Sequence, residues 1–329
     1  MKHKLFFLFL LALFLGCRGD NDSFPLPIFE LEGSGVLAEQ TVEEAEKTIY
    51  GKWGVHASGA QKGNSSTVQR VHSPAKTSHV NCSFHGIEFT RQRYILGVQH
   101  IGSQDGNVSD ELVYSYGTYR LIEAADGRVS RVDLFTTVSG VEQRLASLTD
   151  FTVEKNNSGL RASFSIAFET NVFSTLNCSE LSGSYTALKA EPMDDVALAT
   201  ASSNFDLLIN TWELQGYSNE AGEGLTQMLY RSSCVVPETD ELVADCDPAT
   251  AAEVSFSAYG TYVFSFLNAS GDVLQTLTDS WEFQDDSQTT ITLEEDTIIQ
   301  IEALTSVLLR LQSSTEDDTE TWDFLRLGE

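Results

Sequence analysis

Three residues with zinc-ligand side chains are spaced three apart in the first half of the chain: His79, Cys82 and His85. Imidazole and thiolate groups are ligands that zinc prefers in proteins, so this spacing admits a metal site. A cysteine in an exported protein more often forms a disulfide, however. Side chains also alternate between the two faces of a strand, which would separate these three. We therefore expect no metal here.

Clustered acids in the second half could supply oxygen ligands for calcium. One group surrounds Cys246 and the other forms a short run: Asp240, Glu241, Asp245 and Asp247, then Glu294, Glu295 and Asp296. A defined calcium loop has alternating ligands around a glycine, and neither group has that pattern. We interpret both as solvated turns.

Histidine, which most general-base mechanisms use, is confined to the first half of the mature chain. The residues are His56, His72, His79, His85 and His100. None lies in a recognisable nucleophile motif, and there is no Gly-x-Ser-x-Gly elbow or phosphate-binding loop. Glycoside cleavage needs two facing carboxylates, but with 48 acidic residues any two could face each other. The presence of such residues therefore does not indicate a glycosidase. We predict that the protein is not an enzyme and has no cofactor.

The N-terminus is typical of an exported protein. Lys2 to Lys4 are polar and basic, and Leu5 to Leu15 is an apolar run too short to span a bilayer. Gly16-Cys17 follows as in a lipobox, although Leu15 is larger than the residue usually found two before the cysteine. We predict a signal peptide over 1–16, a lipid on Cys17 and a tether over 17–38. The alternative is an ordinary cleaved signal with a spare cysteine.

The mature chain is strongly acidic, and the charge is uneven. Without Lys2 and Lys4 it has 18 basic and 48 acidic residues, a net charge of −30. Such a chain repels nucleic acid and anionic lipid surfaces. Residues 39–190 have 14 basic and 16 acidic residues, whereas 205–329 have 3 and 25. A solvated surface is the simpler interpretation, and a face for a cationic partner is the other.

Four cysteines remain after Cys17: Cys82, Cys178, Cys234 and Cys246. An even number in an oxidising compartment predicts two disulfides. Three connectivities are possible, and pairing Cys82 with Cys178 and Cys234 with Cys246 keeps each bridge within one half.

The two halves of the chain begin alike. Thr41 and Glu44 fit a capping box before a short helix that ends near Trp53. Ser203 and Asp206 fit a second cap, before apolar residues at helical spacing that reach Trp212. Matched spacings downstream favour a duplicated domain. We predict one domain over 39–190, a linker over 191–203 and an acidic domain over 204–329.

Beyond these helices the pattern is that of short antiparallel strands. Alternating apolar residues recur between turn signals, as in Tyr262, Phe264 and Phe266 before Asn268. This spacing predicts a mainly β fold, either barrel or sandwich.

These residues resemble the lipocalin-like domains of Bacteroidetes lipoproteins. Gly51-Lys52-Trp53 resembles the Gly-x-Trp motif that opens a lipocalin barrel, and Trp212 keeps the tryptophan without the glycine. The acidic stretch after Cys17 resembles their surface-export signal. The resemblance implies two tandem up-and-down barrels, with Gly51, Trp53 and Trp212 as barrel-closing residues. It also implies an outer-membrane or cell-surface location.

Two functions follow from this interpretation. Each barrel could bind a small apolar or amphipathic ligand, and the aromatic residues that we single out as its lining are Phe89, Tyr119, Phe256, Phe264 and Trp281. Alternatively, side chains fill both barrels, and the acidic second domain faces a protein or glycan partner in the envelope.

Overall fold

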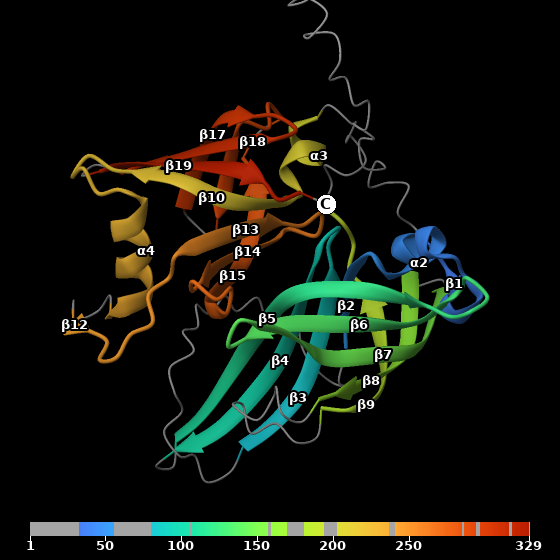
Figure 1. Ribbon diagram of the computed structural model, residues 1–329. Helices are drawn as coiled ribbons and strands as arrows, with labels where there is room; N and C mark the ends of the chain where they lie inside the picture. Colours follow the sequence, from blue (N-terminus) through green and yellow to red (C-terminus); the bar gives the residue numbers. More distant parts are fainter. Residues whose placement is uncertain are drawn as a thin grey trace, which may run out of the picture.

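The computed structural model describes residues 33–55, 80–104, 107–156, 159–169, 181–193, 203–236, 241–284, 286–293, 297–315 and 318–328. Strands dominate, and two closed eight-stranded antiparallel barrels follow one another along the chain (Figure 1). The prediction of a mainly β fold with tandem up-and-down barrels is confirmed.

Barrel 1 is a meander in which each strand pairs with the next in sequence. Its strands are β2 (Gly51–Gly54), β3 (Val80–Phe89), β4 (Arg93–Gln104), β5 (Asn107–Glu123), β6 (Val129–Val138), β7 (Val141–Asn156), β8 (Gly159–Phe168) and β9 (Gly183–Lys189). Pairing of β2 with β9 closes the barrel.

Barrel 2 has the same order of strands, with one insertion after its first. Its strands are β10 (Thr211–Ser218), β13 (Ala251–Phe256), β14 (Thr261–Leu267), β15 (Val273–Phe283), β16 (Thr290–Leu293), β17 (Thr297–Leu304), β18 (Leu308–Ser314) and β19 (Thr319–Arg326). Pairing of β10 with β19 closes it. The insertion contains α4 (Leu225–Cys234) and the small pair β11 (Val235–Val236) and β12 (Glu241–Leu242).

A short helix precedes each barrel, as predicted. The α2 helix (Val42–Ile49) begins with a complete capping box between Thr41 and Glu44. The α3 helix (Asn204–Leu208) is capped by Ser203, whose hydroxyl accepts a hydrogen bond from the backbone amide of Asp206. It is shorter than the apolar spacing suggested.

The two tryptophans play the same structural part in the two barrels. Trp53 and Trp212 are both fully buried. The indole nitrogen of Trp53 donates to the carbonyl of Ile49 at 2.7 Å, and that of Trp212 donates to Leu208 at 2.9 Å. Each indole therefore ties a strand to the helix four residues earlier, which closes that end of the barrel and supports a duplication.

Gly51 is required where barrel 1 begins. Its φ of +132° is unfavourable for residues with a side chain. A Cβ there would also lie 2.8 Å from the Tyr259 hydroxyl of barrel 2. The glycine of the Gly-x-Trp motif thus permits both the chain direction and the close approach of the second barrel.

Part of the segment expected to be a tether packs on barrel 1. The β1 strand (Gly35–Val36) pairs with β7 at Val153 and Thr152. Leu37, in the 3-10 turn η2 (Leu37–Glu39), is buried. The packed chain therefore begins before residue 38, at the helix-closed end of barrel 1.

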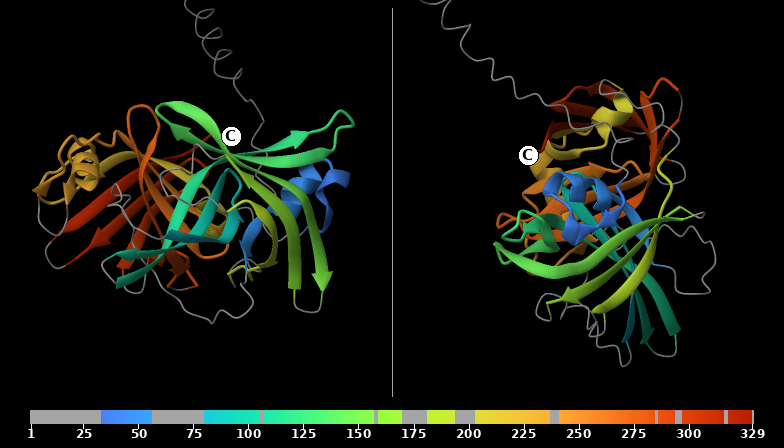
Figure 2. Two further views of the ribbon diagram at one scale, coloured as in Figure 1. Left: turned by 90° about the horizontal axis from the view of Figure 1, so that it is seen from below. Right: turned by 90° about the vertical axis from the view of Figure 1, so that its right-hand side faces the viewer.

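The barrels lie side by side and point the same way (Figure 2). At their closed ends, Arg91 contacts Asp206 of α3. At the other ends, the Gly140 amide donates to Asp272 between β14 and β15. Both helix-closed ends therefore share one side, and α4 lies far from α2 (Figure 1).

A disulfide joins Cys234, at the end of α4, to Cys246 before β13. This confirms one of the two pairs that we favoured. Cys82 is also disulfide-bonded, while Cys178 lies outside the described residues. Within the described ranges, no helix is long and apolar enough to cross a membrane.

Candidate functional site

Aromatic side chains that pack against one another occupy the interior of barrel 1. Trp53 meets Phe151 edge-on at 5.8 Å, and Phe151 stacks on Phe164 at 5.3 Å. The Phe84 ring lies 4.8 Å from the ring of Tyr185. All but Tyr185 are at most 4% exposed. A side chain that lines a ligand-sized cavity would expose more surface, so these side chains fill the barrel.

The closed half of barrel 2 is filled in the same way. The Trp281 ring is stacked on that of Phe205 in α3, with the ring centres 6.1 Å apart, and it meets Phe256 edge-on at 5.5 Å. Its indole nitrogen donates to the carbonyl of Ser257 at 3.0 Å. A buried indole with a fixed partner behaves as a core residue.

The five residues singled out as a ligand lining lie in two separate cores. In barrel 1, Phe89 contacts Tyr119 at 5.2 Å, and the Tyr119 hydroxyl donates to the carbonyl of Thr90. In barrel 2, Phe256 and Trp281 are 1% and 2% exposed. Phe264 is only partly buried and contacts Phe266 and Phe324.

The open end of barrel 2 differs from its closed end. There α4 packs onto the barrel core through Met228 and Leu229. Several inward residues of barrel 2 keep some exposure: Phe264, Leu277 and Trp322. In the described part of barrel 2, the packing is less complete at these side chains than around Trp281.

The surface between the barrels, which we call the seam, contains buried ion pairs. Arg93 donates hydrogen bonds from Nε and Nη2 to the Glu253 carboxylate at 3.0–3.3 Å. These side chains are 12% and 13% exposed. Arg91 donates to Asp206 at 3.1 Å, and Asp206 is 2% exposed. Each pair joins a cation of barrel 1 to an anion of barrel 2.

Hydroxyl groups and a small apolar contact complete the seam. The hydroxyls of Tyr116 and Ser255 lie 2.6 Å apart, and the Lys52 ammonium donates to Thr261 at 2.9 Å. Val263 of barrel 2 packs between Ile95 and Tyr116 of barrel 1. The seam is therefore mixed, with polar contacts around an apolar centre.

Burial changes the acidity of groups in the seam. Desolvation raises the pKa of Asp206, and the Arg91 charge opposes this rise. Burial, together with the charge of Glu253, raises the pKa of Tyr116 to about 12. The tyrosine therefore stays neutral at physiological pH and acts there as a hydrogen-bonding group.

Few of the described acidic side chains of barrel 2 form ion pairs with basic residues of the same barrel. Arg231 contacts Glu223 at 3.0 Å, and Arg310 contacts Asp323 at 2.6 Å. Several of its other described acids are exposed, among them Glu220, Glu241 and Asp245 near α4. This end of barrel 2 is an acidic surface on the side away from the first described residues.

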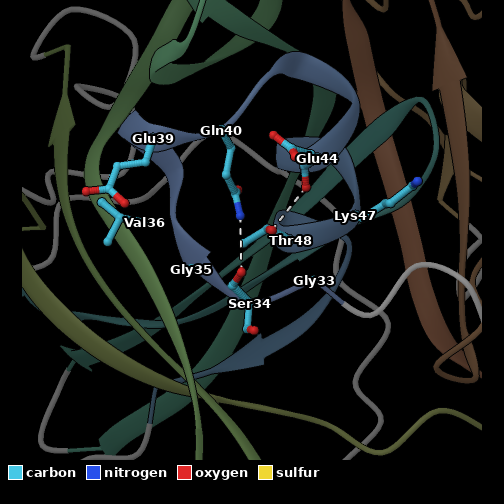
Figure 3. A pocket seen from close by; sticks show the side chains of 9 residues that line it. All are labelled: Gly33, Ser34, Gly35, Val36, Glu39, Gln40, Glu44, Lys47 and Thr48. Carbon is cyan, nitrogen blue, oxygen red and sulfur yellow. Dashed lines mark hydrogen bonds between the residues drawn. The ribbon is translucent and has the colours of Figure 1, made fainter.

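A shallow cleft of about 460 Å³ lies beside α2, where the described chain begins (Figure 3). Gln40 spans it and donates to the carbonyl of Ser34 at 3.2 Å. The Thr48 hydroxyl donates to the Glu44 carbonyl at 3.0 Å. Its polar groups are mostly engaged with one another, so the cleft joins the entering chain to α2.

The zinc and calcium candidates are not assembled in the described part of the chain. No group of three or more His, Cys, Asp or Glu side chains with metal-binding geometry occurs there. Cys82 is engaged in a disulfide, and Asp247 accepts a hydrogen bond from Asn268. His79, Asp240 and residues 294–296 lie outside the described ranges.

The fold defines a class: two closed eight-stranded antiparallel barrels in tandem, consistent with a lipocalin-like fold. No protein-family model and no curated protein matches the sequence. The architecture therefore rests on the structure and on the motifs described above.

Proposed function

We propose that the protein is an exported lipoprotein, anchored through Cys17, whose two solid barrels present a surface to a macromolecular partner. The observation that carries this is the packing inside the barrels. Phe89, Phe256 and Trp281, which a carrier would turn toward its ligand, are 0–2% exposed and packed within the cores. No catalytic role enters the proposal.

The end of barrel 1 at which the described chain begins supports this proposal. The first described residues lie at the closed end of barrel 1, where the Gly33 amide donates to the carbonyl of Lys47. The barrels point the same way, so an anchor at this end directs the acidic α4 end of barrel 2 away from the membrane. A cationic protein segment fits that surface by charge.

A small-ligand carrier is the second candidate, and the open end of barrel 2 favours it. Phe264, Leu277 and Trp322 point inward there and remain partly exposed. An apolar molecule beneath α4 would cover these three side chains.

Native mass spectrometry of the full chain, purified in detergent from its own host, separates the two functions. We expect the mass of the acylated chain with no small molecule lost on denaturation. A stoichiometric small molecule that is released on denaturation would instead establish the carrier. Cys17→Ala tests the anchor separately, because it should move the protein out of the membrane fraction.

A further inference from the structure

A disulfide in the insertion of barrel 2 fixes the end of the α4 helix. It joins Cys234, the last residue of α4, to Cys246, which lies shortly before β13 begins at Ala251. Along the backbone, the same two cysteines are separated by the excursion that contains β11 and β12. The bridge therefore gives α4 a short covalent link to β13 in place of a long one. Beside it, the Ala249 amide donates to Ser233 at 2.9 Å.

The hydrogen-bonded wall of barrel 2 is interrupted between β10 and β13. These strands pair only from Thr211 to Glu213 of β10, whereas β10 pairs with β19 as far as Ser218. The rest of β10 therefore has no strand on one of its sides within the described ranges. The α4 helix contacts β10 and lies between the two separating strands (Figure 1). It thus covers the interruption in the wall.

Two aromatic side chains of barrel 2 lie at this interruption. Tyr217 of β10 is 7% exposed, and its ring is 5.9 Å from that of Trp322, its partner in the register with β19. Burial and the hydrogen bond to Glu320 raise the pKa of Tyr217, and the charge of Arg231 on α4 opposes this rise. The helix therefore lies close to Tyr217, and its release would expose both rings to solvent.

The non-covalent contacts that hold α4 are modest. Apart from Cys234, the helix buries only Met228 and Leu229. Its ion pair joins Arg231 to Glu223, and the arginine is 54% exposed, so the pair contributes little. A helix of 10 residues is also shorter than the roughly 12–15 residues below which isolated helices are marginal in water. The placement of α4 therefore depends on the disulfide.

We propose that the disulfide between Cys234 and Cys246 is a redox latch, whose reduction by a dithiol releases α4 from barrel 2. Cys234 is fully buried, whereas Cys246 is partly exposed and receives the attack of a thiolate of the dithiol. The S–S bond breaks, and its electron pair passes to the Cys234 sulfur, which takes up a proton. The second thiol of the reductant then displaces Cys246 as a thiol. The protein gains two thiols, and the dithiol is oxidised to a disulfide.

The state of the latch decides whether the end of barrel 2 is covered. With the bridge formed, α4 covers Tyr217 and lies over the interruption beside β10. With the bridge reduced, the rings of Tyr217 and Trp322 become accessible to another molecule. This device goes beyond the partner surface proposed above and does not depend on it.

The test compares the full chain in detergent with and without dithiothreitol, by hydrogen exchange and by acrylamide quenching of tryptophan fluorescence. We expect reduction to speed exchange of the α4 amides by about tenfold or more, because the bridge restricts the loop that must open. Trp53, Trp212 and Trp281 are 0–2% exposed, so increased quenching would report on Trp322. The amides of α2 are the internal control and should exchange equally in both states.

The double variant Cys234→Ser/Cys246→Ser separates this bridge from that of Cys82, which dithiothreitol also attacks. Without reductant it should match the reduced wild type, and dithiothreitol should change it no further. Trp322→Phe should remove the added quenching of the reduced chain.

Two results would overturn the latch. Unchanged exchange of the α4 amides in the reduced wild type would make the bridge a purely structural link, and this comparison decides the proposal even where the double variant does not fold. A double variant that still responds to dithiothreitol would assign the response to the bridge of Cys82.

Discussion

The ion pair between Arg93 and Glu253 offers a direct test of whether the two barrels form one body. Glu253→Gln keeps the size of the side chain and removes the charge. Arg93 would then lie in the seam, 12% exposed, without a counter-ion. Removal of one partner of a buried pair costs about 3–5 kcal/mol. The remaining exposure favours the lower limit, so we expect a loss of about 3 kcal/mol.

The matched control is Glu142→Gln in barrel 1. Glu142 also pairs with an arginine, Arg120, at 2.7 Å, but these side chains are 43% and 54% exposed. Exposed pairs contribute about 0–1 kcal/mol. We therefore expect the control to lose less than about 1 kcal/mol.

Urea unfolding monitored by tryptophan fluorescence measures both variants. Each barrel has a buried tryptophan, Trp53 and Trp212, so the signal follows both. The wild type should unfold in a single transition if the seam couples the barrels. Equal losses in the two variants would refute our reasoning, because the seam would then be as solvated as the outer surface.

Three further predictions concern single elements. Thr41→Ala removes the hydroxyl and so breaks the capping box with Glu44, and urea unfolding should show a loss of about 1 kcal/mol; no loss would mean that α2 is held by packing alone. Cys246→Ser opens the loop closed with Cys234 and should cost about 3 kcal/mol in the same assay, whereas an unchanged midpoint would make that bridge dispensable. Burial alone would raise the pKa of Asp133, but hydrogen bonds from arginine and serine neighbours outweigh it and lower the pKa. The stability that the ionised Asp133 contributes is therefore fully present above the ordinary carboxyl pKa near 4. It is lost as the pH falls through the lower pKa that Asp133 has in the folded state. Asp133→Asn should lower Tm at pH 7 and flatten its decline below pH 4, and parallel Tm curves would contradict this.

Local signals were sufficient to predict much of the fold. The pattern from Thr41 to Glu44 predicted a capped helix, because both partners of the cap lie within one turn of chain. Trp53 and Trp212 were predicted to close the barrels, and each is tied to the helix just before it. Alternation of apolar residues predicted antiparallel strands, since each strand pairs with the next.

The seam could not be predicted in this way. Arg93 and Glu253 are 160 residues apart, and Arg91 and Asp206 are 115 apart. No periodicity links such positions, because their contact depends on how two complete barrels pack. The α4 helix was also missed, since it is a short insertion with only three buried side chains, Met228, Leu229 and Cys234.

Packing also decides what an aromatic residue inside a barrel does. The sequence marks Phe256 and Phe264 as inward positions of neighbouring strands, but it does not show whether space remains between them. In the structure Phe256 is buried at the closed end and Phe264 is partly exposed nearer α4. The same residue type is therefore fully buried at one position and partly exposed at the other.

The uneven charge of the two halves of the chain is reflected in the ion pairs of the seam. Barrel 2 has three arginines, of which Arg231 and Arg310 pair with carboxylates of their own barrel. The carboxylates of Asp206 and Glu253 in the seam pair with Arg91 and Arg93 at the β3–β4 turn of barrel 1. Arg326 of barrel 2 also acts on Asp206 and opposes the rise of its pKa that burial causes, so the seam arginines add to a charge that barrel 2 itself supplies. Two arginines of the near-neutral first barrel thus balance two carboxylates of the second at the seam, while the other acids of barrel 2 that are exposed face solvent.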